Sequence, residues 1–210
     1  MADRIIKIIT PADSFDLLTK EEVKLALSIA DSDTSHDALI DQLIDSYSDM
    51  VSELCNRVFA KEKLSETWRY LQSNRVFLSH WPVKTADIES VESPRGTIIP
   101  TTDWELEEGS GKLSLWGSRA EPIVVTYTGG FVLPDDAPDA LKQACVLLVQ
   151  YDRSQAQRQA TSGIRSISHK SARVMFFDPN QGSRGGGGGP GSTAADAVHN
   201  LLMHYTRLEV

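Results

Sequence analysis

The residue types that could do chemistry in this chain are few: two cysteines, five histidines and one short glycine-lysine loop. A phosphate-binding loop needs the pattern Gly-x-x-x-x-Gly-Lys-Ser/Thr. Around Gly111 and Lys112 that pattern fails, because Leu106 replaces the first glycine and Leu113 replaces the hydroxyl residue. We therefore interpret residues 107–111 as the glycine-containing loop of a β-hairpin.

The histidines and cysteines do not form a metal-binding pattern. His199 and His204 are five positions apart, about 140° around a helix, so they do not share a face as two metal ligands would. Cys55 and Cys145 lie within apolar helical patterns, which indicates small buried side chains. Because no nucleophile, base and orienting group come together, we expect no enzyme, no cofactor and no metal.

The charge of the chain is unevenly distributed. The net charge of −8 over 210 residues argues against a general nucleic-acid-binding protein, since such proteins usually carry a basic surface. Residues 1–137 hold 24 acidic and 13 basic residues, whereas residues 138–210 hold 5 acidic and 8 basic ones. No apolar run approaches the roughly 18 residues of a membrane span. We expect a soluble protein of intracellular origin with no membrane partner.

The clearest helix is predicted over residues 35–59, with an acidic side opposite a broad apolar side. The apolar side predicts a buried stripe, formed by Leu39, Leu43, Tyr47, Met50, Leu54 and Val58 and widened by Ile40, Ile44, Val51 and Cys55. The other side carries an acidic ridge at four-residue spacing, formed by Asp37, Asp41, Asp45, Asp49 and Glu53. This ridge is either a solvated helix face or a surface that repels DNA phosphates or meets a basic partner.

Two further helices and a β region complete the predicted core. Thr19 and Glu22 have capping-box spacing at the start of a helix over residues 19–30. A helix over residues 138–157 is apolar on nearly all sides, so we expect it to be central and to pack on the stripe. Short candidate strands occur between residues 64 and 131. The predicted fold class is α+β and mainly helical: a small helical bundle with an inserted antiparallel β-hairpin region and a tethered C-terminal helix.

A basic stretch follows the third predicted helix. Residues 153–177 contain no acidic residue. The basic side chains of this stretch are Arg153, Arg158, Arg165, Lys170 and Arg173. They form either a solvated helix end and loop or a basic interface, which would contact an acidic neighbouring subunit or DNA phosphates.

The C-terminal part is predicted to be a tethered helix. Seven of the 14 glycines lie between positions 182 and 191, which predicts a flexible linker over residues 181–192. This linker divides the chain into a core of residues 1–180 and a helix within residues 193–210. A helix this short is marginal alone in water, so it must dock on its own domain or on another chain. We favour docking on another chain, through Val198, Leu201, Leu202, Tyr205 and Leu208.

The order of these features resembles a known family. The segments that carry the resemblance are residues 18–24 (LTKEEVK), 37–44 (DALIDQLI), 55–57 (CNR), 81–83 (WPV), 88–91 (IESV), 125–131 (VTYTGGF) and 138–144 (PDALKQA). In order and spacing they resemble the head-tail connector (adaptor) proteins of tailed bacteriophages and prophages, over about residues 15–157. The glycine linker and the last helix lie outside this part.

The resemblance implies a structural role in the virion. Such adaptors form a ring, usually of twelve copies, below the portal protein, and the ring extends the DNA channel and receives the next neck, stopper or tail protein. It implies DNA that passes without sequence-specific binding, a place in the virion neck, and assembly in the host cytoplasm. The acidic ridge would line the channel or a subunit interface, and the tail helix would dock on the portal.

Two other classes of function stay open from the sequence. The first is a DNA-packaging or DNA-binding factor, such as a small terminase subunit, which would use the basic stretch on phosphates. The second is an enzyme of unrecognised type, for which the sequence offers no candidate residues. Salt-sensitive binding to duplex DNA would favour the former, and a pocket with converging polar groups would favour the latter.

Overall fold

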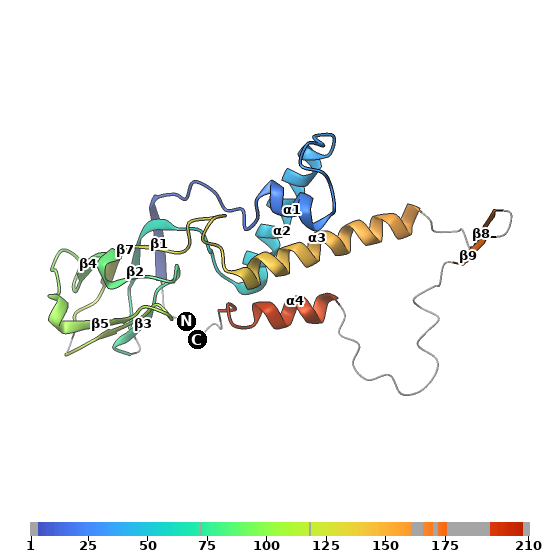
Figure 1. The fold of residues 1–210 in the computed structure, drawn as a ribbon. Coiled ribbons are helices and arrows are strands. Elements are labelled where there is room, and N and C mark those ends of the chain that lie inside the picture. Colours follow the sequence, from blue (N-terminus) through green and yellow to red (C-terminus); the bar gives the residue numbers. More distant parts are fainter. Residues whose placement is uncertain are drawn as a thin grey trace, which may run out of the picture.

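The fold consists of a β half and a helical half, each with its own hydrophobic core (Figure 1). The computed structural model describes residues 4–71, 73–117, 119–160, 166–169, 172–175 and 194–207. The predicted linker over residues 181–192 lies outside these residues. The chain begins in the β half, crosses to the helices, returns for most of the strands and ends with helices.

An antiparallel four-stranded sheet with the strand order β1-β2-β7-β4 forms one layer of the β half. Its strands are β1 (Arg4–Thr10), β2 (Glu62–Trp68), β4 (Ile88–Glu92) and β7 (Ile123–Gly129). Side chains alternate between the two faces, as strand geometry requires. Leu64 pairs with Tyr127, and Trp68 pairs with Ile123, so large buried side chains share one face.

A three-stranded antiparallel sheet packs against that face. Its order is β3-β6-β5, with β3 (Arg75–Phe77), β5 (Trp104–Glu107) and β6 (Lys112–Leu115). The predicted hairpin joins β5 to β6, and Gly111 in its loop has a φ of +66°, which favours glycine. Short 3-10 helices, η1 (Thr85–Asp87) and η2 (Thr101–Asp103), precede β4 and β5. Trp104 and Leu113 are buried with the core residues of the first sheet.

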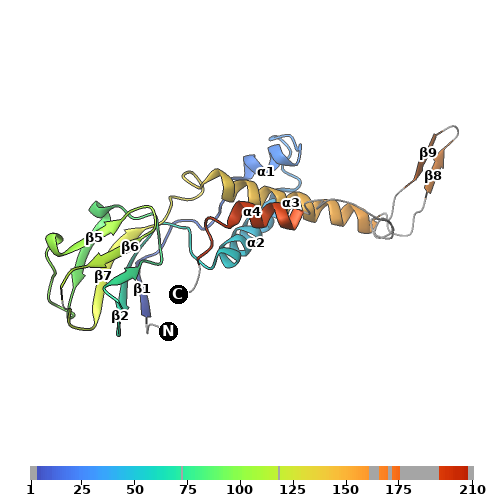
Figure 2. The same cartoon turned by 90° about the horizontal axis from the view of Figure 1, so that it is seen from below.

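Within the described residues, four helices form the second half. They are α1 (Lys20–Ala26), α2 (Asp37–Cys55), α3 (Asp139–Ala160) and α4 (Ala194–Leu202). The capping box of Thr19 and Glu22 is present at the start of α1, and Asn56 in a left-handed conformation ends α2. α3 is the central helix and lies against the other three (Figure 2). Beyond α3, β8 (Ser166–His169) and β9 (Ala172–Met175) pair as a ribbon.

The expected fold class, a mainly helical bundle with an inserted hairpin region, is wrong. The strands of the β half form two antiparallel sheets that enclose a hydrophobic core, so this half has its own core just as the helical half does. It is not an insertion either, because β1 precedes all the helices and forms an edge of the larger sheet. The sequence signal of β1, a run of β-branched isoleucines, was overlooked.

The expected buried stripe of α2 is also partly wrong. The residues that face the core are Ile40, Ile44, Val51 and Cys55, which are at most 5% exposed. Leu39, Met50 and Leu54 were expected to be the centre of the stripe, but they are 54%, 42% and 54% exposed. The reason is tertiary, because α3 packs on one side of the apolar arc and no described element covers the other side.

Arg57 is buried where the two halves meet. Its guanidinium lies 3.5 Å from the ring centroid of Trp81, in the β half, and 4.6 Å from that of Phe59, and it donates a hydrogen bond to the carbonyl oxygen of Trp81. Burial lowers the pKa of Arg57 to about 10, so the guanidinium stays charged at neutral pH. Stacking on two aromatic rings compensates part of the cost of burying this charge.

Candidate functional site

A buried polar network lies between β2, β7 and residues 79–80. The hydroxyl of Tyr127 and both the amide and the hydroxyl of Ser79 donate hydrogen bonds to one carboxylate oxygen of Glu66. The imidazole of His80 lies 3.0 Å from a carboxylate oxygen of Glu62 and 2.9 Å from the hydroxyl of Ser79. All five side chains are buried, and Glu66 is 0% exposed.

The contact between a serine, a histidine and a glutamate is the combination used in nucleophilic catalysis, so its geometry matters. Ser79 and His80 are 6% and 3% exposed, and the hydroxyl of Ser79 already donates to Glu66. Burial lowers the pKa of His80 and raises the pKa of Tyr127, which favours the neutral form of both groups. The arrangement suits a structural network that joins the sheet to residues 79–80.

The sequence pattern alone does not predict this network, because its members come from β2, residues 79–80 and β7, which are far apart in the chain. The usable signal was the position of Glu66, which lies between Leu64 and Trp68 on the buried face of β2. A carboxylate at such a position must find hydrogen-bond donors when it is buried.

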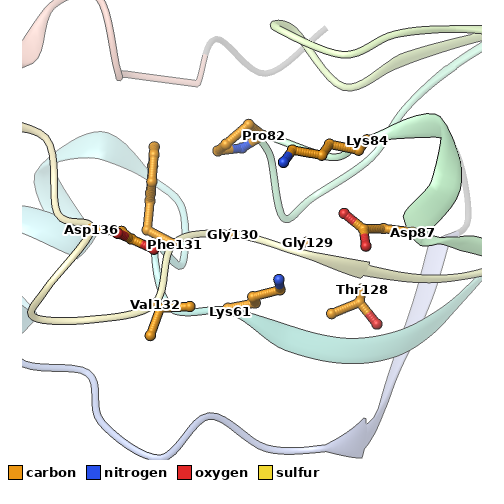
Figure 3. Close-up of a pocket in the computed structure, with 10 residues that line it drawn as sticks. All are labelled: Lys61, Pro82, Lys84, Asp87, Thr128, Gly129, Gly130, Phe131, Val132 and Asp136. Atoms are coloured by element: carbon orange, nitrogen blue, oxygen red, sulfur yellow. The ribbon is translucent and has the colours of Figure 1, made fainter.

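A pocket of about 270 Å³ lies where β7 ends and the chain turns toward α3 (Figure 3). Its lining is Lys61, Pro82, Lys84, Asp87, Thr128, Gly129, Gly130, Phe131, Val132 and Asp136. Figure 3 shows Lys61 and Lys84 on opposite sides of the backbone of Gly129 and Gly130. The lining contains two lysines and two aspartates, so it offers ionic contacts to a polar ligand.

The described residues include no metal-binding cluster and no membrane-spanning helix. Among the residues that the structure describes, no three His, Cys, Asp or Glu side chains are grouped closely enough to hold a metal ion. Within those residues, no helix has the length and apolarity that crossing a bilayer requires.

The acidic ridge of α2 is partly neutralised by α1. Lys24 lies 2.7 Å from Asp37, and Lys20 lies 3.0 Å from Asp41, so these two carboxylates are paired. The remaining members, Asp45, Asp49 and Glu53, are exposed and form no ion pair with any described residue. We call these three residues the acidic trio. It is the part of the predicted ridge that keeps its charge available to a partner.

The tail helix lies on its own chain (Figure 2). Val198 and Leu202 are buried in the helical core, and Leu201 and Tyr205 are partly buried against it. Tyr205 packs edge-on against Phe59 with ring centroids 6.3 Å apart. Self-docking is therefore what the structure shows for these four residues, so docking on another chain requires α4 to leave this position. Leu208 lies outside the described residues.

The basic stretch is placed only in part. Arg153 lies near the end of α3 and its guanidinium donates to the carbonyl oxygen of Leu27 at 3.4 Å. Arg158 belongs to α3 and Arg173 to β9, but their side chains are outside the described part, as are Arg165 and Lys170 entirely. Whether these residues form one interface stays a prediction.

The docking of α4 leads to a stability prediction. We expect Leu202→Ala to lower the free energy of unfolding by about 2–4 kcal/mol, because it removes a buried side chain and leaves a cavity. Its control is Met203→Ala, which changes an exposed neighbour in the same turn and should cost less than about 0.5 kcal/mol. Urea denaturation measures both. Equal midpoints for the two variants would contradict the docking of α4 in solution.

A comparison with protein-family models identifies the family of this chain. The model of the head completion protein family matches residues 16–171. The chain belongs to the head completion protein family. The match covers most of the chain, including α1, α2, the strands from β2 to β7 and α3. It confirms the relationship to head-tail connector proteins that the sequence predicted, and with it a connector role between head and tail.

Solved structures with the same fold come from gene transfer agent (GTA) particles. One is described as "Neck of empty GTA particle computed with C6 symmetry"; it is 15% identical, with 98% of this chain and 97% of that chain covered and a TM-score of 0.57. Another, "Neck of native GTA particle computed with C12 symmetry", is 16% identical over the same shares, with a TM-score of 0.53. At 15–16% identity, the similarity of this chain to the two neck structures establishes the fold alone. A search of curated proteins finds no match.

Proposed function

We propose that this head completion protein is a non-enzymatic subunit of an oligomeric ring in the virion neck. The observation that carries the proposal is the family match over residues 16–171. The solved structures of the same fold support it, because they belong to particle necks treated with sixfold or twelvefold symmetry. The buried state of Ser79 and His80 supports the non-enzymatic part, since substrate has no access to them.

The proposed ring has twelve copies, assembles in the host cytoplasm and connects the portal protein to the next neck, stopper or tail protein. DNA passes through it without sequence-specific binding, which agrees with the net charge of −8, because few Lys or Arg contacts to phosphate mean weak affinity with little salt dependence. For the portal contact we propose the tail residues Val198, Leu201, Leu202, Tyr205 and Leu208. In this proposal α4 leaves its own helical half and buries the same apolar face on the portal.

The test is assembly of particles without this protein. We expect heads that are filled with DNA but carry no tail, and we expect added purified protein to restore tail attachment, as counted by electron microscopy. The Met203→Ala variant should restore attachment as well as the unchanged protein does. Normal numbers of tailed particles in its absence would contradict the proposal. Empty heads would contradict it in a different way and favour a DNA-packaging factor.

A further inference from the structure

The strand β1 is an edge strand with large apolar side chains on both faces. Within the described part of the chain it pairs with β2 alone, so the backbone groups of its outer edge are open. Ile5, Ile6, Ile8 and Ile9 are 40–47% exposed. Alternation places Ile6 and Ile8 on the side of Glu66 and Leu64, but the two isoleucines stay 40% and 41% exposed there.

Such an edge needs a partner. Soluble proteins usually protect edge strands with charges, proline, bulges or a covering segment, because an exposed apolar edge associates with other chains. Over its seven residues β1 has Arg4 and Lys7 as charges, one register shift near its end and no proline. Four exposed isoleucines in one strand form an apolar patch of the kind that marks interaction surfaces.

A second apolar strip lies on α2, in the other half of the molecule (Figure 1). Leu39, Met50 and Leu54 are exposed on one side of this helix, and Leu43 is partly buried beside them. By helical spacing, the acidic trio occupies the neighbouring face of α2. The strip is thus apolar in its middle and negatively charged along one side.

The surface of β1 and the strip on α2 are complementary in apolar character and in charge. Each provides aliphatic side chains, and the exposed charge beside the isoleucines is positive, whereas the charge beside the leucines is negative. Lys7 forms no ion pair with any described residue, and the acidic trio forms none either. Arg4 adds positive charge at the start of β1, 3.9 Å from a carboxylate oxygen of Glu66. Opposite charges at the edge of an apolar contact fix its register and speed its formation.

We propose that β1 of one copy docks on the α2 strip of the next copy, with Lys7 toward the acidic trio. Because one chain carries both surfaces in different places, the contact is heterologous, and a repeated heterologous contact gives a ring when its rotation closes and a filament when it does not. This inference rests on the proposed function, in which the protein works as a ring. It assigns the acidic trio to the subunit interface rather than to the channel wall.

Cysteine cross-linking in purified particles tests the inference. One variant carries Ile5→Cys with Leu54→Cys, and two control variants carry a single exchange each; the native Cys55 and Cys145 are 0% exposed and out of reach of the reagent. With a short bismaleimide we expect the double variant to give a ladder of covalent oligomers up to the whole ring. Each single variant should give none.

Every other pattern overturns the inference. Dimers from Ile5→Cys alone would show that β1 pairs with β1, and a link to a different protein would show another occupant. Tailed particles without any ladder would contradict the β1–α2 contact but leave the proposed function intact. Tailed particles that do not contain the protein at all would contradict the proposed function and, with it, the inference that rests on it.

Charge reversal gives a second readout that does not depend on cross-linking. We expect Lys7→Glu to reduce the yield of tailed particles about tenfold, which corresponds to about 1.4 kcal/mol of lost contact energy. Adding Glu53→Lys in the same chain should restore the yield, because the opposite charges face each other again. A thermal melt shows that the variants fold. Loss of yield without rescue in a folded double variant would overturn the pairing of Lys7 with the trio.

Discussion

Replacing Glu66 by alanine is expected to lower the free energy of unfolding by about 3–5 kcal/mol. Glu66 is 0% exposed and accepts hydrogen bonds from the hydroxyl of Tyr127 and from the amide and the hydroxyl of Ser79. Alanine removes the acceptor that these three buried donors share, and the amide of Ser79 then has no partner in the network. Each unsatisfied buried donor costs about 1–3 kcal/mol. Urea denaturation of the purified protein measures the loss.

Two controls separate the network from general effects of substitution. Glu66→Gln keeps the shape and one acceptor oxygen, so we expect a loss of about 1–2 kcal/mol. Glu89→Ala changes an exposed glutamate that pairs with Lys63, and exposed pairs contribute about 0–1 kcal/mol. A Glu66→Ala protein that is as stable as Glu89→Ala would show that the network does not stabilise the β half.

The features predicted correctly from the sequence depend on residues close together in the chain. The capping box of Thr19 and Glu22 needs only a three-residue spacing, and the hairpin around Gly111 needs only two adjacent strands and a short loop. Local hydrogen bonds fix both of them. The family relationship was also accessible, because it depends on the order of such local segments along the chain.

The errors concern contacts between distant segments. In α2 the apolar residues span a wide arc, and the positions of the other helices decide that Ile44 is buried while Leu54 is exposed. In β1 the pairing partner of Ile6 is Glu66, sixty positions away. Periodicity cannot reveal such a partner, so the strand was missed, and with it the second core and the correct fold class.

The partners of the candidate surfaces also depend on contacts between distant segments, which periodicity cannot reveal. An apolar helix face such as that of Val198 and Leu202 fits a groove on its own chain or on a partner equally well by sequence pattern, and the structure places it on its own chain. Helical spacing places the acidic ridge on one side of α2, but its pairing with Lys20 and Lys24 depends on how α1 lies against α2. The acidic trio could therefore not be separated from the ridge beforehand.

Gly130 is the position where a single methyl group is expected to do the most damage. It has a φ of +105°, and a Cβ added there would lie 2.3 Å from the carbonyl oxygen of Ala60. That oxygen belongs to backbone, which cannot move as a flexible side chain does. Its neighbour Phe131 forms backbone hydrogen bonds with Phe59 and Lys61. We call this contact, between residues 59–61 and 130–131, the joint between the two halves. We expect Gly130→Ala to lose more than about 4 kcal/mol of unfolding free energy.

Two other glycines divide this cost into its causes. Gly96 has a φ of +89° but nothing within 4 Å of an added Cβ, so Gly96→Ala measures the backbone strain alone, about 1–3 kcal/mol. At Gly129 an added Cβ would lie 2.2 Å from the carbonyl oxygen of His80 without a positive φ, so Gly129→Ala measures the clash alone. If the loss at Gly130 does not exceed the loss at Gly96, the joint is not tightly packed in solution. A tight joint matters for a ring subunit, because the proposed contact places one half of each copy against the other half of the next, and a loose joint would leave the closing angle undefined.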